Sequence, residues 1–461
     1  MKITNPIIPS SPIEVFVETK GELDFKAICV FAAIGFFLEE DTYWTHKKIL
    51  SPAAFHELDN HHKLLTSKPY FNWHYSPRTI SFNQALEEFT SLFETIIMER
   101  TKGRRVILPL SGGLDSRTQA VALKHIGAEV SSYSYEFENG YSETKIAKQI
   151  AAVCGFDFQS FKIKKGYLWK KLVDLAKLNG CCSDFTSPRQ MAIADEFASM
   201  GDVFSLGHWG DVLFDSYNCE TMSHEAQVEF LSNKLLKRGG LEFASRLWQT
   251  WGLEGDFKSY FFNRISSALN TIKIEDTNAR LRAFKSKYWA PRWTSVNLSV
   301  FEHYKPITLP YYDNRMCEFI CTVPEDYLKD RQLQIAYIKR RNPKLAELTW
   351  QDKRPYNLYD FNKPTAIKTF SYKVLNKLKR EAKQISGNPY NQRNWELQFL
   401  GEDNRKQLEN VLNESKLSDF IPEGIISTYI DKFYNKNALQ NAHALNMLLV
   451  LAKFNQTQNN G

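Results

Sequence analysis

Between residues 83 and 206 the chain alternates between two hydrophobic periods, and each period predicts a different kind of element. Residues 83–100 place Leu86, Phe89, Leu92, Phe93 and Ile96 near the spacing of one helix face, which predicts an amphipathic helix. Short apolar runs and helical stretches then alternate, as is typical of a parallel, doubly wound α/β sheet. We expect strands at 105–110, 129–136, 157–163 and 202–206, and helices at 116–126, 142–154, 167–179 and 188–199.

The segments on either side of this region follow other patterns. Residues 26–75 hold short apolar runs between charged turns, among them Ala27–Leu38 and Tyr43–Leu50, and we expect these to be strands of a small β-rich unit. Beyond about residue 220 the pattern is mostly helical, and Asn455–Gly461 is expected to be a frayed tail. The expected fold class is therefore α/β, with a small β-rich N-terminal part and a mostly helical C-terminal part.

The junction between the first strand and its helix carries the strongest chemical signal. The apolar run Val106–Leu110 leads into Ser111-Gly112-Gly113-Leu114-Asp115-Ser116. A Gly-Gly turn at a helix N-terminus presents backbone N–H groups to an anion, and the helix dipole adds to the attraction for phosphate. We expect the glycines to supply positive φ and a close approach, the serines to donate hydroxyl hydrogen bonds, and Asp115 to hold magnesium.

A second strand end is expected to meet this loop, because ligands of open α/β sheets bind where the carboxyl ends of the strands diverge. The strand at 202–206 runs into Leu206-Gly207-His208-Trp209-Gly210-Asp211. Asp211 is well placed to be a second magnesium ligand facing Asp115. The alternative is a structural aspartate that caps the next helix.

Composition narrows the class of protein without identifying a partner. With 461 residues, 43% hydrophobic and 24% charged, the chain is typical of a globular protein of two or three domains. The net charge of +7 is modest and does not indicate a nucleic-acid partner. Four cations, Lys377, Lys379, Arg380 and Lys383, fall on one expected helix. A solvated helix face is the simpler interpretation, and a phosphate-rich partner is the alternative.

The cysteines and the N-terminal residues indicate in which cellular compartment the protein is expected. Seven cysteines form no CxxC pair and no zinc-binding spacing with histidine, which favours reduced thiols. The first residues lack the apolar region of a signal peptide, and the run Ile28–Leu38 is too short to span a bilayer. We therefore expect a cytoplasmic protein without a membrane segment.

The loop 111–116 resembles the Ser-Gly-Gly-x-Asp-Ser pyrophosphatase loop of the N-type ATP pyrophosphatases, and the spacing differs from the phosphate loop that ends in Gly-Lys-Ser/Thr. Three further segments make the chain similar to the synthetase domain of the asparagine synthetase family. They are Gly207–Phe214, which is similar to Gly-Glu-Gly-x-Asp-Glu-Leu-Phe, Leu309–Phe319, which is similar to Val-Pro-Phe-Leu-Asp-x-Arg-x-x-Glu-Phe, and Leu348–Lys353. His208 and Val212 stand where the family usually has glutamates.

The resemblance implies a sheet of the ATP-pyrophosphatase (adenine nucleotide alpha hydrolase-like) type, with ATP and Mg²⁺ as cofactors. A substrate carboxylate would be adenylated with release of pyrophosphate, and ammonia or an amine would then form the amide. Magnesium would lie at Asp115 and Asp211, and Lys353 would stabilise the charge that develops on the phosphates. The expected nucleotide contacts are Leu110, Ser111, Gly112, Gly113, Asp115, Ser116, Ser134, Tyr135 and Gly207.

His208 has two open interpretations at this point. With a pKa near neutrality it would suit a general acid or base for the incoming amine. It would equally suit a shape-filling replacement of the usual glutamate.

The N-terminal part is similar to the end of the family's glutaminase domain, but Lys2 stands where full-length relatives expose a nucleophilic cysteine. We therefore expect a truncated remnant at 1–78, a synthetase domain at 79–360 and a helical extension at 361–461. The nitrogen would come from free ammonia, a separate glutaminase or an amine of another molecule. The alternatives are an enzyme that amidates a sugar uronic acid or a peptide carboxylate, in surface-polysaccharide or natural-product assembly, and a non-catalytic nucleotide-binding relative.

Overall fold

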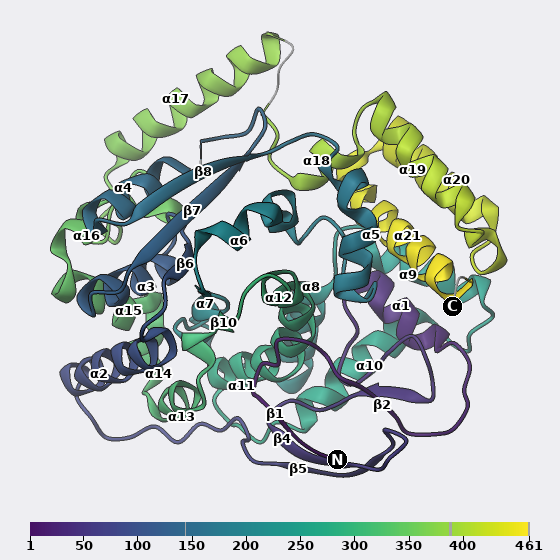
Figure 1. Ribbon diagram of the computed structural model, residues 1–461, viewed down its shortest axis with the longest axis horizontal. Coiled ribbons are helices and arrows are strands. Elements are labelled where there is room, and N and C mark those ends of the chain that lie inside the picture. The colour runs from purple at the N-terminus through teal and green to yellow at the C-terminus, as the bar shows by residue number, and fades with distance from the viewer. Residues whose placement is uncertain (143, 387–389, 460–461) are drawn as a thin grey trace.

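A five-stranded parallel sheet forms the centre of the computed structural model, which describes residues 1–142, 144–386 and 390–459 (Figure 1). The strand order is β10-β9-β6-β7-β8. The strands are β6 (Val106–Pro109), β7 (Val130–Phe137), β8 (Asp157–Ile163), β9 (Val203–Ser205) and β10 (Ile307–Thr308). The chain moves outward from β6 to β8 and then returns to the other side of β6, so the sheet is doubly wound. The expected α/β class is confirmed.

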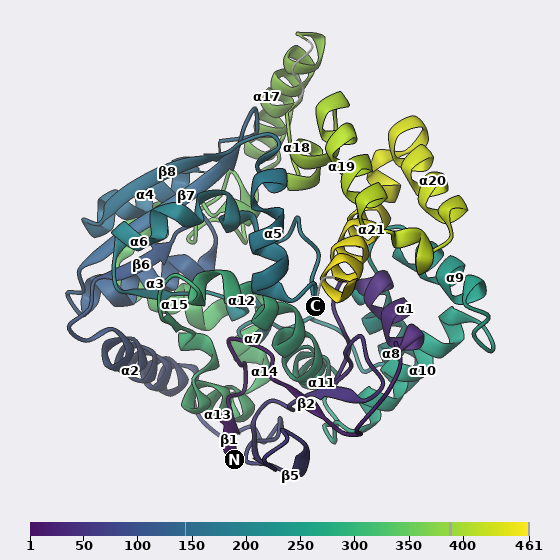
Figure 2. The ribbon, with the colours of Figure 1, turned by 45° about the vertical axis from the view of Figure 1, so that its right-hand side comes forward.

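Helices cover both faces of this sheet (Figure 2). One layer contains α2 (Phe82–Thr101), α3 (Leu114–His125), α4 (Thr144–Cys154), α15 (Gln332–Arg341) and α16 (Pro343–Glu347). The other contains α5 (Tyr167–Asn179), a 3-10 helix at Arg189–Glu196, α6 (Phe197–Met200) and α12 (Ser295–Glu302). In this second layer Phe197 and Phe301 each contact Phe204 of β9 with ring centroids 5.0 Å apart. Strands buried on both faces explain the uninterrupted apolar run at Val106–Leu108.

The helical boundaries follow local signals. Ser81 and Gln84 form a capping box that starts α2, and Phe89, Phe93 and Ile96 are fully buried on its inner face. The expected helix at 188–199 is instead a 3-10 helix followed by the short α6. The tail expected at 455–461 is helical as far as the structure describes it, because α21 (Ala438–Asn459) continues through it.

The remaining helices lie between β9 and β10 and after β10. The first group is α7 (Gly210–Leu213), α8 (His224–Leu235), α9 (Gly240–Thr250), α10 (Phe257–Asn270), α11 (Thr277–Phe284) and a π-helix at Lys285–Thr294. The second group follows β10 and includes α15 and α16, already described. Its other members are α13 (Asn314–Thr322), α14 (Glu325–Leu328), α17 (Ala366–Ile385), α18 (Asn394–Phe399), α19 (Glu402–Glu414) and α20 (Glu423–Asp431). Within the described ranges no helix combines the length and the apolarity needed to cross a bilayer.

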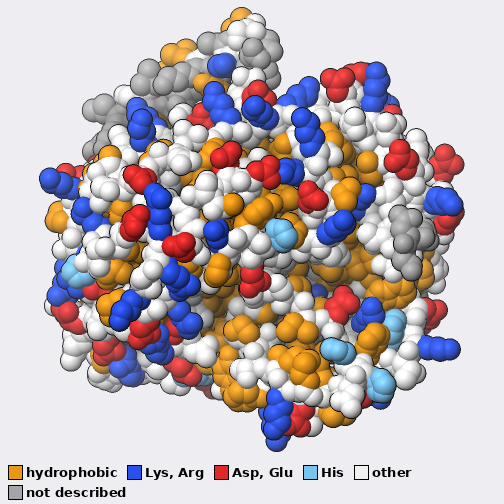
Figure 3. Space-filling view, viewed as in Figure 1, with side chains coloured by type: hydrophobic (Ala, Val, Ile, Leu, Met, Phe, Trp, Pro, Cys, Tyr) orange, Lys and Arg blue, Asp and Glu red, His pale blue; other side chains and the backbone are white. Residues whose placement is uncertain are grey.

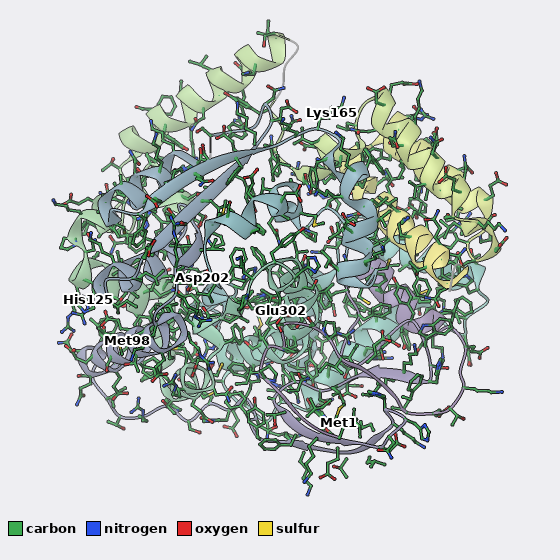
Figure 4. All side chains as sticks on the ribbon, viewed as in Figure 1. Met1, Met98, His125, Lys165, Asp202 and Glu302 are labelled. Atoms are coloured by element: carbon green, nitrogen blue, oxygen red, sulfur yellow. The ribbon has the colours of Figure 1, made fainter. Side chains whose placement is uncertain are left out.

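The N-terminal part contains two small antiparallel sheets. Strands β1 (Lys2–Asn5), β4 (Ala54–Leu58) and β5 (Leu64–Pro69) form one, and β2 (Glu14–Phe16) pairs with β3 (Lys47–Ile49). The hydroxyls of Ser10 and Ser11 donate to Glu302 of α12, which is labelled in Figure 4, at 2.6 and 2.9 Å. A cavity of about 510 Å³ lies between these strands and the π-helix, and none of the expected site residues lines it.

The expectation of a strand at Ala27–Leu38 is wrong, because α1 (Phe25–Ile34) occupies most of that run. The Asp24 side chain caps its start, and Gly35, with φ of 82°, ends it. Every residue from Ala27 to Ile34 is buried, so the run has no polar face to reveal a helical period. Periodicity alone does not distinguish such a helix from a buried strand.

The contact between α1 and α9 generates a prediction. A Cβ at Gly240 would collide with the carbonyl oxygen of Ala33, so the two backbones meet there. We expect Gly240→Ala to destabilise the protein by about 1–3 kcal/mol. Gly424→Ala in α20, where no atom lies within 4 Å of the new Cβ, should stabilise by about 0.5–1 kcal/mol. Thermal melts would measure both, and equal melting temperatures for the two variants would contradict the packing.

Candidate active site

A cavity of about 400 Å³ lies at the carboxyl ends of β6, β7 and β9, where the strand order reverses. Eight of the expected site residues line it: Leu110, Ser111, Asp115, Ser116, Ser134, Tyr135, Gly207 and His208. The opposite end of the sheet is marked by Asp202, labelled in Figure 4, whose carboxylate accepts the Arg105 N–H at 2.8 Å. The cavity is therefore at the edge where open α/β sheets bind their ligands.

Two serines close the loop after β6 at the start of α3. The Ser111 N–H donates to Ser116 Oγ at 3.0 Å, and the two hydroxyl oxygens are also 3.0 Å apart. The Gly113 N–H donates to Ser111 Oγ at 3.2 Å. Helix α3 begins at Leu114, so its N-terminal N–H groups and both hydroxyls are together at the rim of the cavity.

The glycines of the loop have a different role from the expected one. Gly113 has φ of −76°, and Gly112 is also outside the positive-φ region, so neither supplies a left-handed turn. The requirement for glycine at position 112 is steric instead, because a Cβ there would be 2.7 Å from Gln351 Oε1 and 3.0 Å from Ile146 Cγ2. The expected positive φ is therefore wrong, and the expected close approach of the loop backbone to a ligand stays a prediction.

Asp115 is the centre of a hydrogen-bond network. Its carboxylate accepts from the Arg331 guanidinium, from Gln334 at 3.2 Å and from the Asp211 N–H at 3.2 Å. The Tyr311 hydroxyl donates to the Asp115 carbonyl at 3.1 Å, and Gln334 donates to that hydroxyl at 3.0 Å. Burial raises the Asp115 pKa to about 6, and the charge of Asp211 adds to the rise.

The turn after β9 packs directly on this aspartate. A Cβ at Gly207 would be 3.2 Å from Asp115 Cβ, and one at Gly210 would collide with the Asp115 carboxylate. Trp209, between them, has φ of 63°, a strained conformation for a bulky residue. Asp211 is exposed at the start of α7. The glycines therefore let the two aspartates approach.

The aspartates provide a suitable donor set for magnesium. Oxygen ligands suit this ion, which is usually held in nucleotide sites by one or two carboxylates together with phosphate oxygens and water. Within residues 1–142, 144–386 and 390–459, no group of three or more His, Cys, Asp or Glu side chains could hold a metal. Asp115 and Asp211 would therefore hold the ion jointly with a bound nucleotide, and not as a closed protein site.

A buried arginine fixes the segment 345–351 against the loop. Arg117 in α3 donates to the carbonyl oxygens of Leu345, Leu348, Thr349 and Gly112, at distances of 2.7 to 3.2 Å. This brings Gln351 to the cavity, where its Oε1 accepts the Gly112 N–H at 3.0 Å. The Gln351 N–H in turn donates to the Gly112 carbonyl at 3.1 Å.

Lys353 lies two residues beyond Gln351, on a 3-10 turn at Gln351–Lys353. Its side chain is exposed, with Nζ 5.8 Å from the centre of the Trp350 ring, and it does not line the cavity. Four of the expected residues, Gly112, Gly113, Asp211 and Lys353, thus do not line the cavity.

His208 is half-buried beside α12, with its ring edge-on to Phe301 at 5.9 Å between centroids. Burial lowers its pKa to about 4. The expected pKa near neutrality is therefore wrong, because the apolar surroundings disfavour the imidazolium. At neutral pH the ring is uncharged.

The cavity also contains polar groups that the motifs did not indicate. Arg189 and Gln190 line it from the 3-10 helix, opposite Ser134 and Tyr135 of β7. The Tyr133 hydroxyl is buried without a hydrogen-bond partner among the described residues. The sequence motifs gave no sign of these three residues.

The family comparison agrees with this geometry. A family model described as asparagine synthase matches residues 88–424, well over half of the chain. The chain belongs to the asparagine synthase family. Members of this family are ATP-dependent ligases that form carbon–nitrogen bonds. A search of curated proteins found no match. Among solved structures the chain is similar to NMN synthetase from Francisella tularensis, with 13% identity over 50% of this chain and 98% of that one, at a TM-score of 0.22.

The Arg117 contacts generate a second prediction. Lysine cannot reach four carbonyl oxygens, so Arg117→Lys should lower the free energy of unfolding by at least about 2 kcal/mol. It should also weaken ATP binding, because Gln351 and the loop lose their common support. Calorimetric melts and titrations would measure this, with Arg405→Lys at the exposed Glu409 pair as the matched control. Unchanged ATP affinity in Arg117→Lys would contradict the support role.

A third prediction concerns His208. Because its pKa is about 4, we expect His208→Gln to change the turnover rate without altering the shape of the pH profile between about pH 5.5 and about pH 8. Steady-state rates across this range would measure it. Loss of an ionisation near pH 6.5 in the variant would show instead that the histidine titrates during catalysis.

Proposed function

We propose that this chain activates a substrate carboxylate by adenylation and then forms an amide with ammonia or an amine. The observation that carries the proposal is the meeting of the 111–116 loop with the Asp115–Asp211 pair at one cavity. A phosphate-binding helix N-terminus next to two carboxylates suits MgATP. Family membership supports the same class of reaction.

The first step would take place at the rim of the cavity. A carboxylate oxygen of the substrate attacks the α-phosphorus, the bond to the bridging oxygen breaks, and pyrophosphate leaves. The Ser111 and Ser116 hydroxyls and the N–H groups at the start of α3 would hold the phosphates, and magnesium at Asp115 and Asp211 would neutralise their charge. Lys353 would have to turn from the Trp350 ring toward the phosphates, which its exposed side chain is free to do.

The second step would form the amide. The nitrogen lone pair attacks the acyl carbon, the carbon–oxygen bond to AMP breaks, and the nitrogen loses a proton. Neutral His208 faces the cavity and would orient the acyl group or accept a hydrogen bond from the nitrogen nucleophile. Ser134 and Tyr135 would contact the adenine, and Arg189 and Gln190 would contact the acceptor or ribose.

The acceptor differs from aspartate in this proposal. His208 and Val212 stand where the family usually has glutamates, and His208 lines the cavity, so its lining carries a neutral ring in place of a carboxylate. A sugar uronic acid or a peptide carboxylate is therefore preferred, with free ammonia, a separate glutaminase or an amine substrate as the nitrogen source.

Asp115→Asn tests the proposal. The change removes the carboxylate charge while keeping the shape, so we expect pyrophosphate release to fall by about a thousandfold or more. The amide keeps an oxygen that can accept from Arg331, Gln334 and the Asp211 N–H, and a melting temperature near that of the wild type would show that the variant folds. Asp195→Asn, at the exposed pair with Lys171, is the matched control and should keep full activity.

The assay would supply MgATP, ammonium and, in separate reactions, aspartate, a uronic acid and a peptide mixture. Pyrophosphate that depends on one carboxylate would identify the acceptor class. Full activity in Asp115→Asn would contradict the site. Binding of ATP without pyrophosphate for any acceptor would favour a non-catalytic nucleotide-binding role.

A further inference from the structure

Helix α17 (Ala366–Ile385) carries an apolar stripe with no described partner. It projects from the body near α4 and β8, and both views show it extending away from the other helices (Figures 1 and 2). Phe370, Leu378 and Ile385 are 70%, 57% and 88% exposed, and Val374 is also exposed. Apolar side chains of this size normally face a core when they recur on one side of a helix.

The four residues share one face. They are spaced by four, four and seven positions, and at 3.6 residues per turn they fall within an arc of about 80°. The basic residues whose side chains the structure describes, Lys373, Lys377, Arg380 and Lys383, fall outside this arc. Figure 3 shows exposed hydrophobic side chains on this helix at the top of the molecule. The helix is thus amphipathic, with a cationic polar face.

Charge is concentrated here to an unusual degree. The sequence of α17 contains six Lys or Arg and one Glu, which gives six minus one, or +5, while the whole chain carries +7. The single acidic residue, Glu381, pairs with Lys377 at 3.7 Å. Lys373, Lys377 and Arg380 border the Phe370 side of the stripe, within about 80° of it, and Lys383 lies opposite the stripe. A helix with an exposed apolar stripe bordered by basic side chains matches an anionic membrane surface.

Both ends of the helix are attached to the body. At the start, the Tyr356 hydroxyl contacts Thr369 Oγ1 at 2.7 Å and donates to the Thr365 carbonyl at 2.9 Å. Just beyond the end, the Asn391 side chain donates to the Glu138 carbonyl at 2.7 Å, and Tyr390 stacks on Tyr141 at 4.2 Å. Described contacts to the body thus lie at the start of α17 and in the segment that resumes at Tyr390.

We propose that α17 docks this protein on an anionic lipid surface, with Phe370, Val374, Leu378 and Ile385 in the acyl boundary and the lysines and arginine at the phosphate headgroups. Nucleic acid would satisfy the cations but would leave the apolar stripe in water. A second copy of the helix would bury the stripe but would bring two strongly cationic faces together. An anionic lipid surface would bury the apolar stripe and also place phosphate groups next to the cations. Docking would leave the helix parallel to the membrane.

Vesicle flotation with the full chain tests the proposal. We expect the protein to float with vesicles of phosphatidylcholine mixed with phosphatidylglycerol and not with phosphatidylcholine alone, and high salt should weaken the binding. Phe370→Ser combined with Leu378→Ser should reduce the bound fraction by about tenfold or more. Leu65→Ser combined with Val173→Ser, at exposed apolar residues of β5 and α5, is the matched control and should bind like the wild type.

Two charge-reversal substitutions test the basic residues of α17. Lys373→Glu with Arg380→Glu should also abolish flotation, while Lys406→Glu on exposed α19 should not. Melting temperatures near that of the wild type would show that the variants fold. Absence of flotation, or equal flotation of the α17 variants, would overturn the proposal. A different result would also overturn it: the wild-type protein forms a dimer that does not float, and the stripe variants are monomers. The apolar stripe of α17 would then be covered by a second copy of the chain. Pyrophosphate release without vesicles reports separately on the proposed reaction.

Discussion

The close packing of Asp115 against the turn Gly207–Asp211 is the contact on which the site depends. It joins the helix after β6 to the turn after β9, across the point where the strand order reverses. Because Gly207 and Gly210 lack a Cβ, the second backbone can approach the aspartate and donate the Asp211 N–H to it. One contact therefore sets the positions of both carboxylates and of the serine loop.

This arrangement destabilises the charged carboxylate until something compensates it. Burial, with an added contribution from the charge of Asp211, raises the Asp115 pKa to about 6 although Arg331 and Gln334 act in the opposite direction. Under the proposed function, a bound cation between the aspartates would relieve the repulsion between their carboxylates. Arg117 performs a separate task, since it holds Gln351 against the loop through four backbone carbonyls.

Local signals in the sequence predicted the parallel sheet and the loop between β6 and α3, because strand runs, capping residues and the Ser-Gly-Gly motif act over a few residues. Phosphate binding by this loop stays a prediction. Strand β10 escaped prediction, because two residues give no period. Helix α1 was assigned as a strand for a related reason, since a run buried on all sides carries no alternation. Arg331 and Gln334 reach Asp115 from more than 200 positions away, so only the tertiary structure reveals them. The lowered pKa of His208 also depends on α12, which lies about 90 residues further along the chain. The domain boundaries at 78 and 360 stay predictions.

The central claim is that the carboxylate attacks the α-phosphorus of ATP, and oxygen-18 tests it most directly. The acceptor found in the pyrophosphate assay would be labelled in both carboxylate oxygens and turned over with ammonium. The account predicts that one labelled oxygen appears in the phosphate of AMP and that pyrophosphate carries none. Label in inorganic phosphate, with ADP as the nucleotide product, would show attack at the γ-phosphorus and would contradict the account.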